Sequence, residues 1–100
     1  MTYGKALSAL ADPTRRAVFE RLRDGPVSVG DVAAGMSVSR PAVSQHLKAL
    51  TSAGLVTDKP EGTRRVYSID PDGLGELRRW LDEFWDAALD AFKNEVEKNS

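Results

Sequence analysis

Apolar residues recur at three- and four-residue intervals along most of the chain, which predicts a mainly helical protein. The first helical stretch ends at the motif ADP, and a second one follows it and ends at DGP. Asp12 followed by Pro13 marks the start of the second helix. A carboxylate caps free backbone N–H groups, and proline is tolerated at the first helical position because no N–H is needed there. The apolar faces of these two helices are Tyr3, Leu7, Leu10, Val18, Phe19 and Leu22.

Two closely spaced helices are predicted over residues 28–54. Ser28 and Asp31 form an S-x-x-D capping pattern, in which the hydroxyl and the carboxylate each accept an unpaired backbone N–H. Ser39 caps the next helix, and Gly54 ends it in the left-handed conformation. The inward positions are Val29, Val32, Ala33, Met36, Val43, Leu47 and Leu50. Two helices joined by so short a turn form a helix-turn-helix motif.

A β-hairpin is predicted over residues 55–69. The segments LVTDKP and RRVYSI are rich in β-branched and aromatic residues, and EGT between them supplies a glycine turn. Lys59, Arg64 and Arg65 lie toward its tip, which is unusual for a hairpin that packs on a core. A basic hairpin that directly follows a helix-turn-helix motif is a wing, so the expected order of elements is ααααββα.

The last predicted helix runs from Pro71 to about Lys98 and would be about 40 Å long. A stripe of large apolar residues at three- and four-residue spacing follows it as far as Phe92, flanked by Trp80, Trp85 and Val96. The stripe either folds back on the core of its own chain or packs on a partner. Its far end lies beyond the reach of four short helices and a hairpin, which favours a partner.

Charge is distributed unevenly along the 100 residues, which are enough for one small domain. Residues 1–35 carry five basic and four acidic side chains, residues 36–68 five and two, and residues 69–100 four and nine, giving net charges of +1, +3 and −5. The basic middle third favours a nucleic-acid partner, although solvated faces alone would also explain the segregation. The helix-turn-helix and the wing coincide with this basic part.

Several features that the sequence lacks exclude classes of function. The chain has no cysteine, which excludes disulfides, thiolate metal ligands and cysteine nucleophiles. It has no long apolar run and no secretory signal, so we expect a cytoplasmic protein without a membrane partner. No nucleophile, histidine and carboxylate set and no phosphate-binding glycine loop can be assembled, so we expect no enzymatic activity.

The outward face of the helix over residues 40–52 carries small and polar side chains that suit a DNA groove. Arg40, Ser44 and Gln45 lie near its N-terminus and are the candidates for reading base edges, since arginine pairs with guanine and glutamine with adenine. Six further residues are predicted to contact phosphates or flank the site, namely Ser39, His46, Lys48, Thr63, Arg64 and Arg65.

Three of the basic side chains leave alternatives open. Arg15 and Arg16 could approach the DNA backbone, or Arg16 could pair with Glu20 one helical turn later. His46, the single histidine, is either a partly buried packing residue or a DNA contact. An ordinary solvated helix face is the simplest alternative for the whole surface, but the tight turn before it and the basic hairpin after it favour DNA.

In order and over nearly the whole chain, three segments resemble the ArsR/SmtB family of winged helix-turn-helix repressors: ALADPTRRAVFERL, SVGDVAAGMSVSRPAVSQHLKALTSAGLV and EGTRRVYSID. The resemblance implies a homodimer joined by the first and last helices, which binds an imperfect palindrome in its own promoter and represses transcription. The expected interface residues are Leu7, Leu74, Leu77, Leu81, Phe84, Trp85, Ala88 and Phe92.

The sequence departs from the metal-sensing members of that family. Its third helix, SVGDVAAG, has no thiolate, and its last helix has carboxylates but no histidine. Carboxylates alone are poor ligands for zinc, copper or nickel, so we expect no metal and no cofactor. The hypothesis is a regulator that is either constitutive or released by a signal other than a metal; the sequence identifies no inducer. The alternative is a winged-helix protein-interaction module that does not bind specific DNA.

Overall fold

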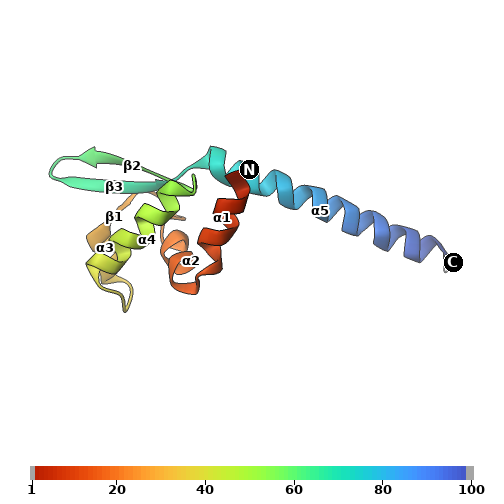
Figure 1. The fold of residues 1–100 in the computed structure, drawn as a ribbon, viewed down its shortest axis with the longest axis horizontal. Coiled ribbons are helices and arrows are strands. Elements are labelled where there is room, and N and C mark those ends of the chain that lie inside the picture. Colours follow the sequence, from red (N-terminus) through yellow and green to blue (C-terminus); the bar gives the residue numbers. More distant parts are fainter. Residues whose placement is uncertain (1, 99–100) are drawn as a thin grey trace.

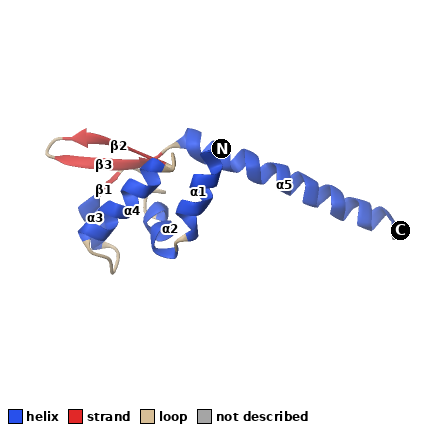
Figure 2. Ribbon diagram, in the orientation of Figure 1, coloured by secondary structure: helices blue, strands red, loops and turns tan. Residues whose placement is uncertain are grey.

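The computed structural model describes residues 2–98, and within them it has the expected mainly helical winged helix-turn-helix architecture (Figure 1). Helices α1 to α4 form one body beside a small antiparallel sheet, and α5 extends away from it (Figure 2). The elements are α1 (Thr2–Ala11), α2 (Pro13–Glu20), β1 (Val27–Ser28), α3 (Val29–Ala34), α4 (Arg40–Ser52), β2 (Val56–Glu61), β3 (Arg64–Ile69) and α5 (Pro71–Lys98).

The helices begin at the side chains that the sequence predicts. Asp12 caps α2, because its Oδ1 accepts hydrogen bonds from the N–H groups of Thr14 and Arg15 at 2.9 and 3.1 Å. Ser39 caps α4 in the same way through the N–H of Ala42, at 3.3 Å. These caps are local in sequence, which is why both starts were predictable.

The end of α4 is also as predicted. Gly54 has a φ of 79°, which only glycine adopts without strain. Its N–H donates to the carbonyl of Thr51, and the N–H of Leu55 donates to the carbonyl of Leu50, both at 3.0 Å. This pair of bonds is the Schellman motif, and it turns the chain sharply into β2.

The sheet contains one strand that the sequence analysis missed. Val27 and Ser28 form β1, which pairs antiparallel with Tyr67 and Val66 of β3, so the order is β1-β3-β2. The predicted order ααααββα therefore becomes ααβααββα. Two residues are too few to show an alternating pattern, and their partner lies about forty residues further along the chain.

The core lies where α2, α3 and α4 pack on the base of the sheet. Val43, Leu47 and Leu50 of α4 are completely buried, as the sequence predicts. Residues from every neighbouring element surround them, including Ala6, Ala9, Val18, Leu22, Val32, Leu55 and Val56. This packing fixes the rotation of α4 about its axis and therefore decides which of its side chains face solvent.

Helix α5 leaves this body as a long arm (Figure 1), and the described chain measures 63 × 26 × 22 Å. Its first turns pack on α1, where Tyr3 stacks on Trp80 with ring centroids 5.5 Å apart. Leu77 is buried within the chain itself, so its burial needs no partner. All residues from Leu81 to Lys98 are exposed. None of the helices in residues 2–98 is long and apolar enough to cross a membrane.

The start of α5 lies directly against the end of α4. The N–H of Asp70 donates to the carbonyl of Leu55 at 2.9 Å. A Cβ atom at Gly73 would overlap the carbonyl oxygen of Gly54, so only glycine allows this approach. The arm and the helix-turn-helix are thus joined by backbone atoms in contact.

Candidate nucleic-acid interface

The outward face of α4 carries the predicted reading residues. Ser44, Gln45 and Lys48 are exposed, because Val43 and Leu47 hold the opposite face in the core. Arg40, in the first turn, is exposed as well. The face is therefore polar, free of large apolar side chains and bordered by the wing.

A hollow of about 300 Å³ lies between α4 and the sheet. Ser44, Gln45 and Lys48 line its helical side. Asp58 and Tyr67, which face each other on β2 and β3, line its other side. The sequence pattern does not predict that these two sheet residues line the site, since their position beside α4 depends on the pairing register of the hairpin.

The structure brings Arg40 together with the two wing arginines. Arg40, Arg64 and Arg65 line one hollow of about 430 Å³, which also includes Asp31 at the start of α3. The Arg40 guanidinium lies close to Gly30, where an added Cβ would be 3.1 Å from its Nη2. Residues widely spaced in the sequence therefore form one basic surface.

Each wing arginine has a carboxylate partner. Arg64 Nη1 lies 3.7 Å from Asp31 Oδ2, and both side chains are more than half exposed. Arg65 Nη1 donates to Asp58 Oδ2 at 2.8 Å, across one diagonal of the hairpin. Ion pairs at such exposed positions contribute little to stability, so phosphate oxygens can replace the carboxylates at small cost.

The contact with Arg64 changes the role predicted for Asp31. Ser28 Oγ accepts the N–H of Asp31 at 3.2 Å, as expected for the cap of α3. The Asp31 carboxylate, which was predicted to complete the capping box, instead lies beside Arg64. The wing approaches the start of α3 closely enough to provide this longer-range partner.

The remaining predicted residues lie in different surroundings. Ser39 is exposed but its hydroxyl caps α4, and Thr63 is exposed in the turn of the wing. His46 is half-buried, and its Nδ1 has no hydrogen-bond partner among residues 2–98. Arg16 donates to the carbonyl of Leu10 at 3.2 Å, a contact that neither of its two predicted roles included.

Among the carboxyl groups of residues 2–98, Asp12 at the cap of α2 is the one with a clearly shifted pKa. The pKa of Asp12 lies below its usual value of 3.8, first because the N–H of Arg15 donates to the carboxylate. Desolvation, the second-largest effect, opposes this shift, while the N–H of Thr14 and the nearby charges of Arg15 and His46 add to it. The carboxylate therefore remains ionised at neutral pH.

Comparison with known proteins agrees with this geometry. A family model described as a helix-turn-helix domain matches residues 10–58. The chain is 56% identical over 93 residues to the HTH-type transcriptional regulator Rv2034 of Mycobacterium tuberculosis, covering 93% of this chain and 87% of that protein. It is 33% identical over 76 residues to the transcriptional repressor SdpR of Bacillus subtilis, covering 76% and 84%.

Solved structures give the same result. A crystal structure of a possible transcriptional regulator for arsenical resistance has 44% identity and a TM-score of 0.73, covering 89% of this chain and 93% of that one. The solution structure of the homodimeric winged helix-turn-helix DNA-binding domain of Mb0332 from Mycobacterium bovis, a possible ArsR-family regulator, has 28% identity and a TM-score of 0.69, covering 90% and 83%. The chain therefore belongs to the ArsR/SmtB family of winged helix-turn-helix transcriptional regulators, which act on DNA and are not enzymes.

Proposed function

We propose that this regulator is a homodimeric repressor that binds a palindromic operator in its own promoter. The observation that carries the proposal is the exposed polar face of α4, which is bordered by a surface where Arg40, Arg64 and Arg65 meet. A helix of this kind enters the major groove by its N-terminal part. The functional parts are the helix-turn-helix over residues 28–54, the wing over residues 55–69 and the dimerisation helix over residues 71–98.

Base recognition belongs to the start of α4. Arg40 and Gln45 offer the side chains that pair in two-bond fashion with guanine and adenine, and Ser44 lies between them. Their exposure supports this role. Lys48, Thr63, Arg64 and Arg65 contact phosphates, and Ser39 and His46 contact phosphates or flank the site.

Dimerisation joins α1 and α5 of two chains. The apolar side chains of α5 from Leu81 onward are about half to two thirds exposed, whereas surface leucines and phenylalanines seldom gather on one face of a monomer. The similar domain of Mb0332 is homodimeric, which supports a dimer here. The interface contains Leu7, Leu74, Leu81, Phe84, Trp85, Ala88 and Phe92. Leu77, which the sequence also placed there, is buried inside its own chain and is left out.

Two recognition helices about 34 Å apart read half-sites about one helical turn, or ten base pairs, apart. The acidic α5 extends away from the wing (Figure 1), so its carboxylates do not oppose the approach of DNA. Within residues 2–98, no three histidine or carboxylate side chains gather into a group that could hold a metal ion.

The test is a fluorescence-anisotropy titration of the protein on DNA from upstream of its own gene and on a scrambled duplex, at two salt concentrations. We expect binding to its own promoter to be about a thousandfold tighter. With six to ten phosphate contacts, log affinity should fall with log salt at a slope of about −5 to −9. Equal binding to both duplexes would contradict autoregulation, and no binding at either salt would favour a protein-interaction module.

Variants separate reading from charge. Gln45→Ala should lower the preference for the operator roughly tenfold or more, while Arg64→Gln should weaken binding to both duplexes equally. Lys93→Gln, on the far part of α5, removes one positive charge away from the proposed interface with DNA and is the matched control. An equal effect of Arg64→Gln and Lys93→Gln would remove the wing from the proposal.

A further inference from the structure

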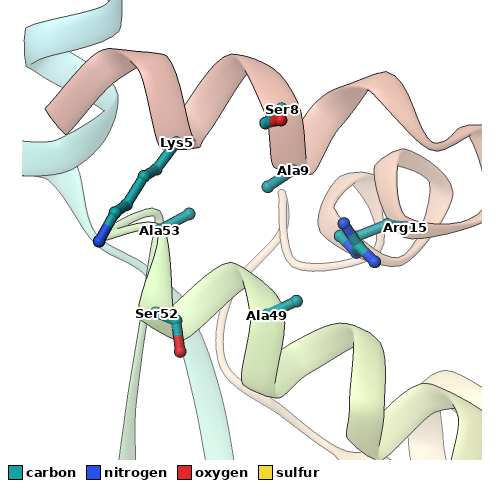
Figure 3. Close-up of a pocket in the computed structure, with 7 residues that line it drawn as sticks. All are labelled: Lys5, Ser8, Ala9, Arg15, Ala49, Ser52 and Ala53. Atoms are coloured by element: carbon teal, nitrogen blue, oxygen red, sulfur yellow. The ribbon is translucent and has the colours of Figure 1, made fainter. Parts of the chain in front are cut away.

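A third hollow lies on the other side of α4 from the wing. Helix α1 bounds it above, α2 on the right and α4 below (Figure 3), and its volume is about 340 Å³. Lys5 and Arg15 lie at opposite ends of it, and Ser8 and Ser52 supply hydroxyl groups. The other lining residues are alanines, whose small side chains leave the space open. None of the residues assigned to the recognition face or the wing lines this hollow, although Arg15 is one of the two arginines considered above as contacts of the DNA backbone.

Neither of the two cations of the hollow has a carboxylate within salt-bridge distance in the described part of the chain. Arg64, Arg65 and Arg78 each form a salt bridge, whereas Lys5 and Arg15 form none within residues 2–98. The Nε of Arg15 is buried and has no hydrogen-bond partner there. A buried donor without an acceptor is costly, so the site gains stability when an external acceptor binds.

The lining of the hollow favours an anion. It contains two positive side chains and no carboxylate. The carboxylate nearest to Arg15 in sequence, Asp12, already accepts two backbone N–H groups at the cap of α2. A guanidinium presents a planar fork of donors that matches phosphate oxygens, and serine hydroxyls donate to the same atoms.

The position of the hollow relates it to DNA. Ser52 lines both this hollow and the one between α4 and the wing, so the two lie on either side of the exposed face of α4. A helix in the major groove, which is about 12 Å wide, has a phosphate backbone on each side of it. With α4 in the groove, the wing on one side of the helix would lie along one backbone, and the hollow with Lys5 and Arg15 on the other side would lie along the second.

We propose that the hollow between α1, α2 and α4 is a phosphate-binding site, in which Arg15 and Lys5 hold a backbone phosphate of the DNA strand on the side of α4 away from the wing. The proposal rests on the DNA-binding function proposed above and adds a contact region outside the recognition helix and the wing. A dimer has two such sites.

The test compares Arg15→Gln, Lys5→Gln and the control Arg23→Gln, an exposed arginine after α2 that does not line the hollow. Affinity for operator and scrambled duplexes is measured against salt. We expect each hollow variant to bind both duplexes roughly tenfold more weakly. The salt slope should decrease by about 2, because one phosphate contact per protomer contributes about 0.9. Arg23→Gln should match the wild type.

A second measurement tells the two sources of phosphate apart. Inorganic phosphate is titrated into the DNA-free protein while the amide NMR signals of Ser8, Ala9 and Ser52 are followed, and we expect no saturation at millimolar phosphate. Saturable shifts that Arg15→Gln abolishes, with unchanged DNA binding, would replace the DNA phosphate by a free phosphate ligand. Hollow variants that match Arg23→Gln in both measurements would overturn the site altogether.

The measurements distinguish the absence of a phosphate site in the hollow from the absence of DNA binding altogether. If the wild type binds its operator specifically but the hollow variants leave affinity and slope unchanged, only the hollow is excluded as a DNA contact. If the wild type binds no DNA, the proposed function and the DNA phosphate fail together. Lys5 is exposed, so Lys5→Gln remains a valid test even if Arg15→Gln unfolds the chain.

Discussion

The winged-helix body and the outer part of α5 contain the same kinds of apolar side chain in opposite environments. In the body, Leu22, Leu47 and Leu50 are no more than 2% exposed. On α5, Leu89 is 49% exposed and Phe92 is 68% exposed. The body completes its core with its own residues, whereas the arm presents an apolar face that only another surface can cover. The two regions should therefore respond differently to the same kind of substitution.

The largest loss of stability is expected in the body. Leu47→Ala removes a completely buried side chain from the centre of α4 and leaves a cavity, which should lower the free energy of unfolding by about 3 kcal/mol. Urea denaturation at two protein concentrations measures it, and the loss should be the same at both. The matched variant Leu89→Ala deletes the same atoms on the arm. It should act mainly by weakening the dimer, so its effect on the unfolding free energy should depend on the protein concentration. A loss below about 1 kcal/mol for Leu47→Ala would contradict the closed core.

The next effect concerns association rather than folding. Phe92→Ala removes a large exposed ring from the proposed interface and should weaken the dimer by about 2 kcal/mol, or roughly 30-fold in the dissociation constant. Sedimentation equilibrium measures this change. Glu83→Ala changes an exposed residue on the opposite face of α5 and should leave the constant unchanged. If both variants dimerise like the wild type, the arm does not hold the dimer.

A smaller effect is expected where the two regions join. Gly73→Ala places a methyl group against the carbonyl of Gly54, and overpacking there should cost about 1 to 2 kcal/mol of unfolding free energy. At Gly75 a Cβ would meet only the end of Arg79, at 3.6 Å. Gly75→Ala should therefore be stabilising by about 0.5 to 1 kcal/mol, as alanine usually is over glycine within a helix. Thermal melts of the two variants should move in opposite directions, and equal shifts would show that the junction is loosely packed.

The sequence predicted the parts of the fold that depend on near neighbours. Asp12, Ser39 and Gly54 act on backbone groups within a few residues, so their roles follow from local spacing. The pairing of β1 with β3 and the contact of Asp31 with Arg64 join residues far apart in sequence. Neither has a local pattern that would identify it.

The same distinction holds for the interface with DNA. The outward face of α4 follows from the helical repeat, because its buried positions determine its exposed ones. The hollow that contains Lys5 and Arg15 depends instead on how α1 and α2 pack against α4. From sequence spacing alone, Arg15 and Arg16 were equal candidates for contacting the DNA backbone. The packing of the helices distinguishes them, because Arg15 lines the hollow and Arg16 donates to the carbonyl of Leu10.

The smallest effect tests the electrostatics of the body alone. Asn caps helices as well as Asp, so Asp12→Asn removes the charge and keeps the cap. Because the pKa of Asp12 is lowered in the folded state, its charge stabilises the fold at every pH above the unfolded value near 3.8. That contribution is lost as pH falls below 3.8 and through the folded pKa. Urea denaturation should show the wild type more stable than Asp12→Asn at neutral pH, with the difference vanishing in acid.

Ser39→Ala, which removes a neutral cap at a cost of about 1 kcal/mol, should show no such pH dependence. Dimer dissociation should be unaffected by Asp12→Asn, since α2 belongs to the body, and a change in it would mean that the body and the arm are energetically coupled.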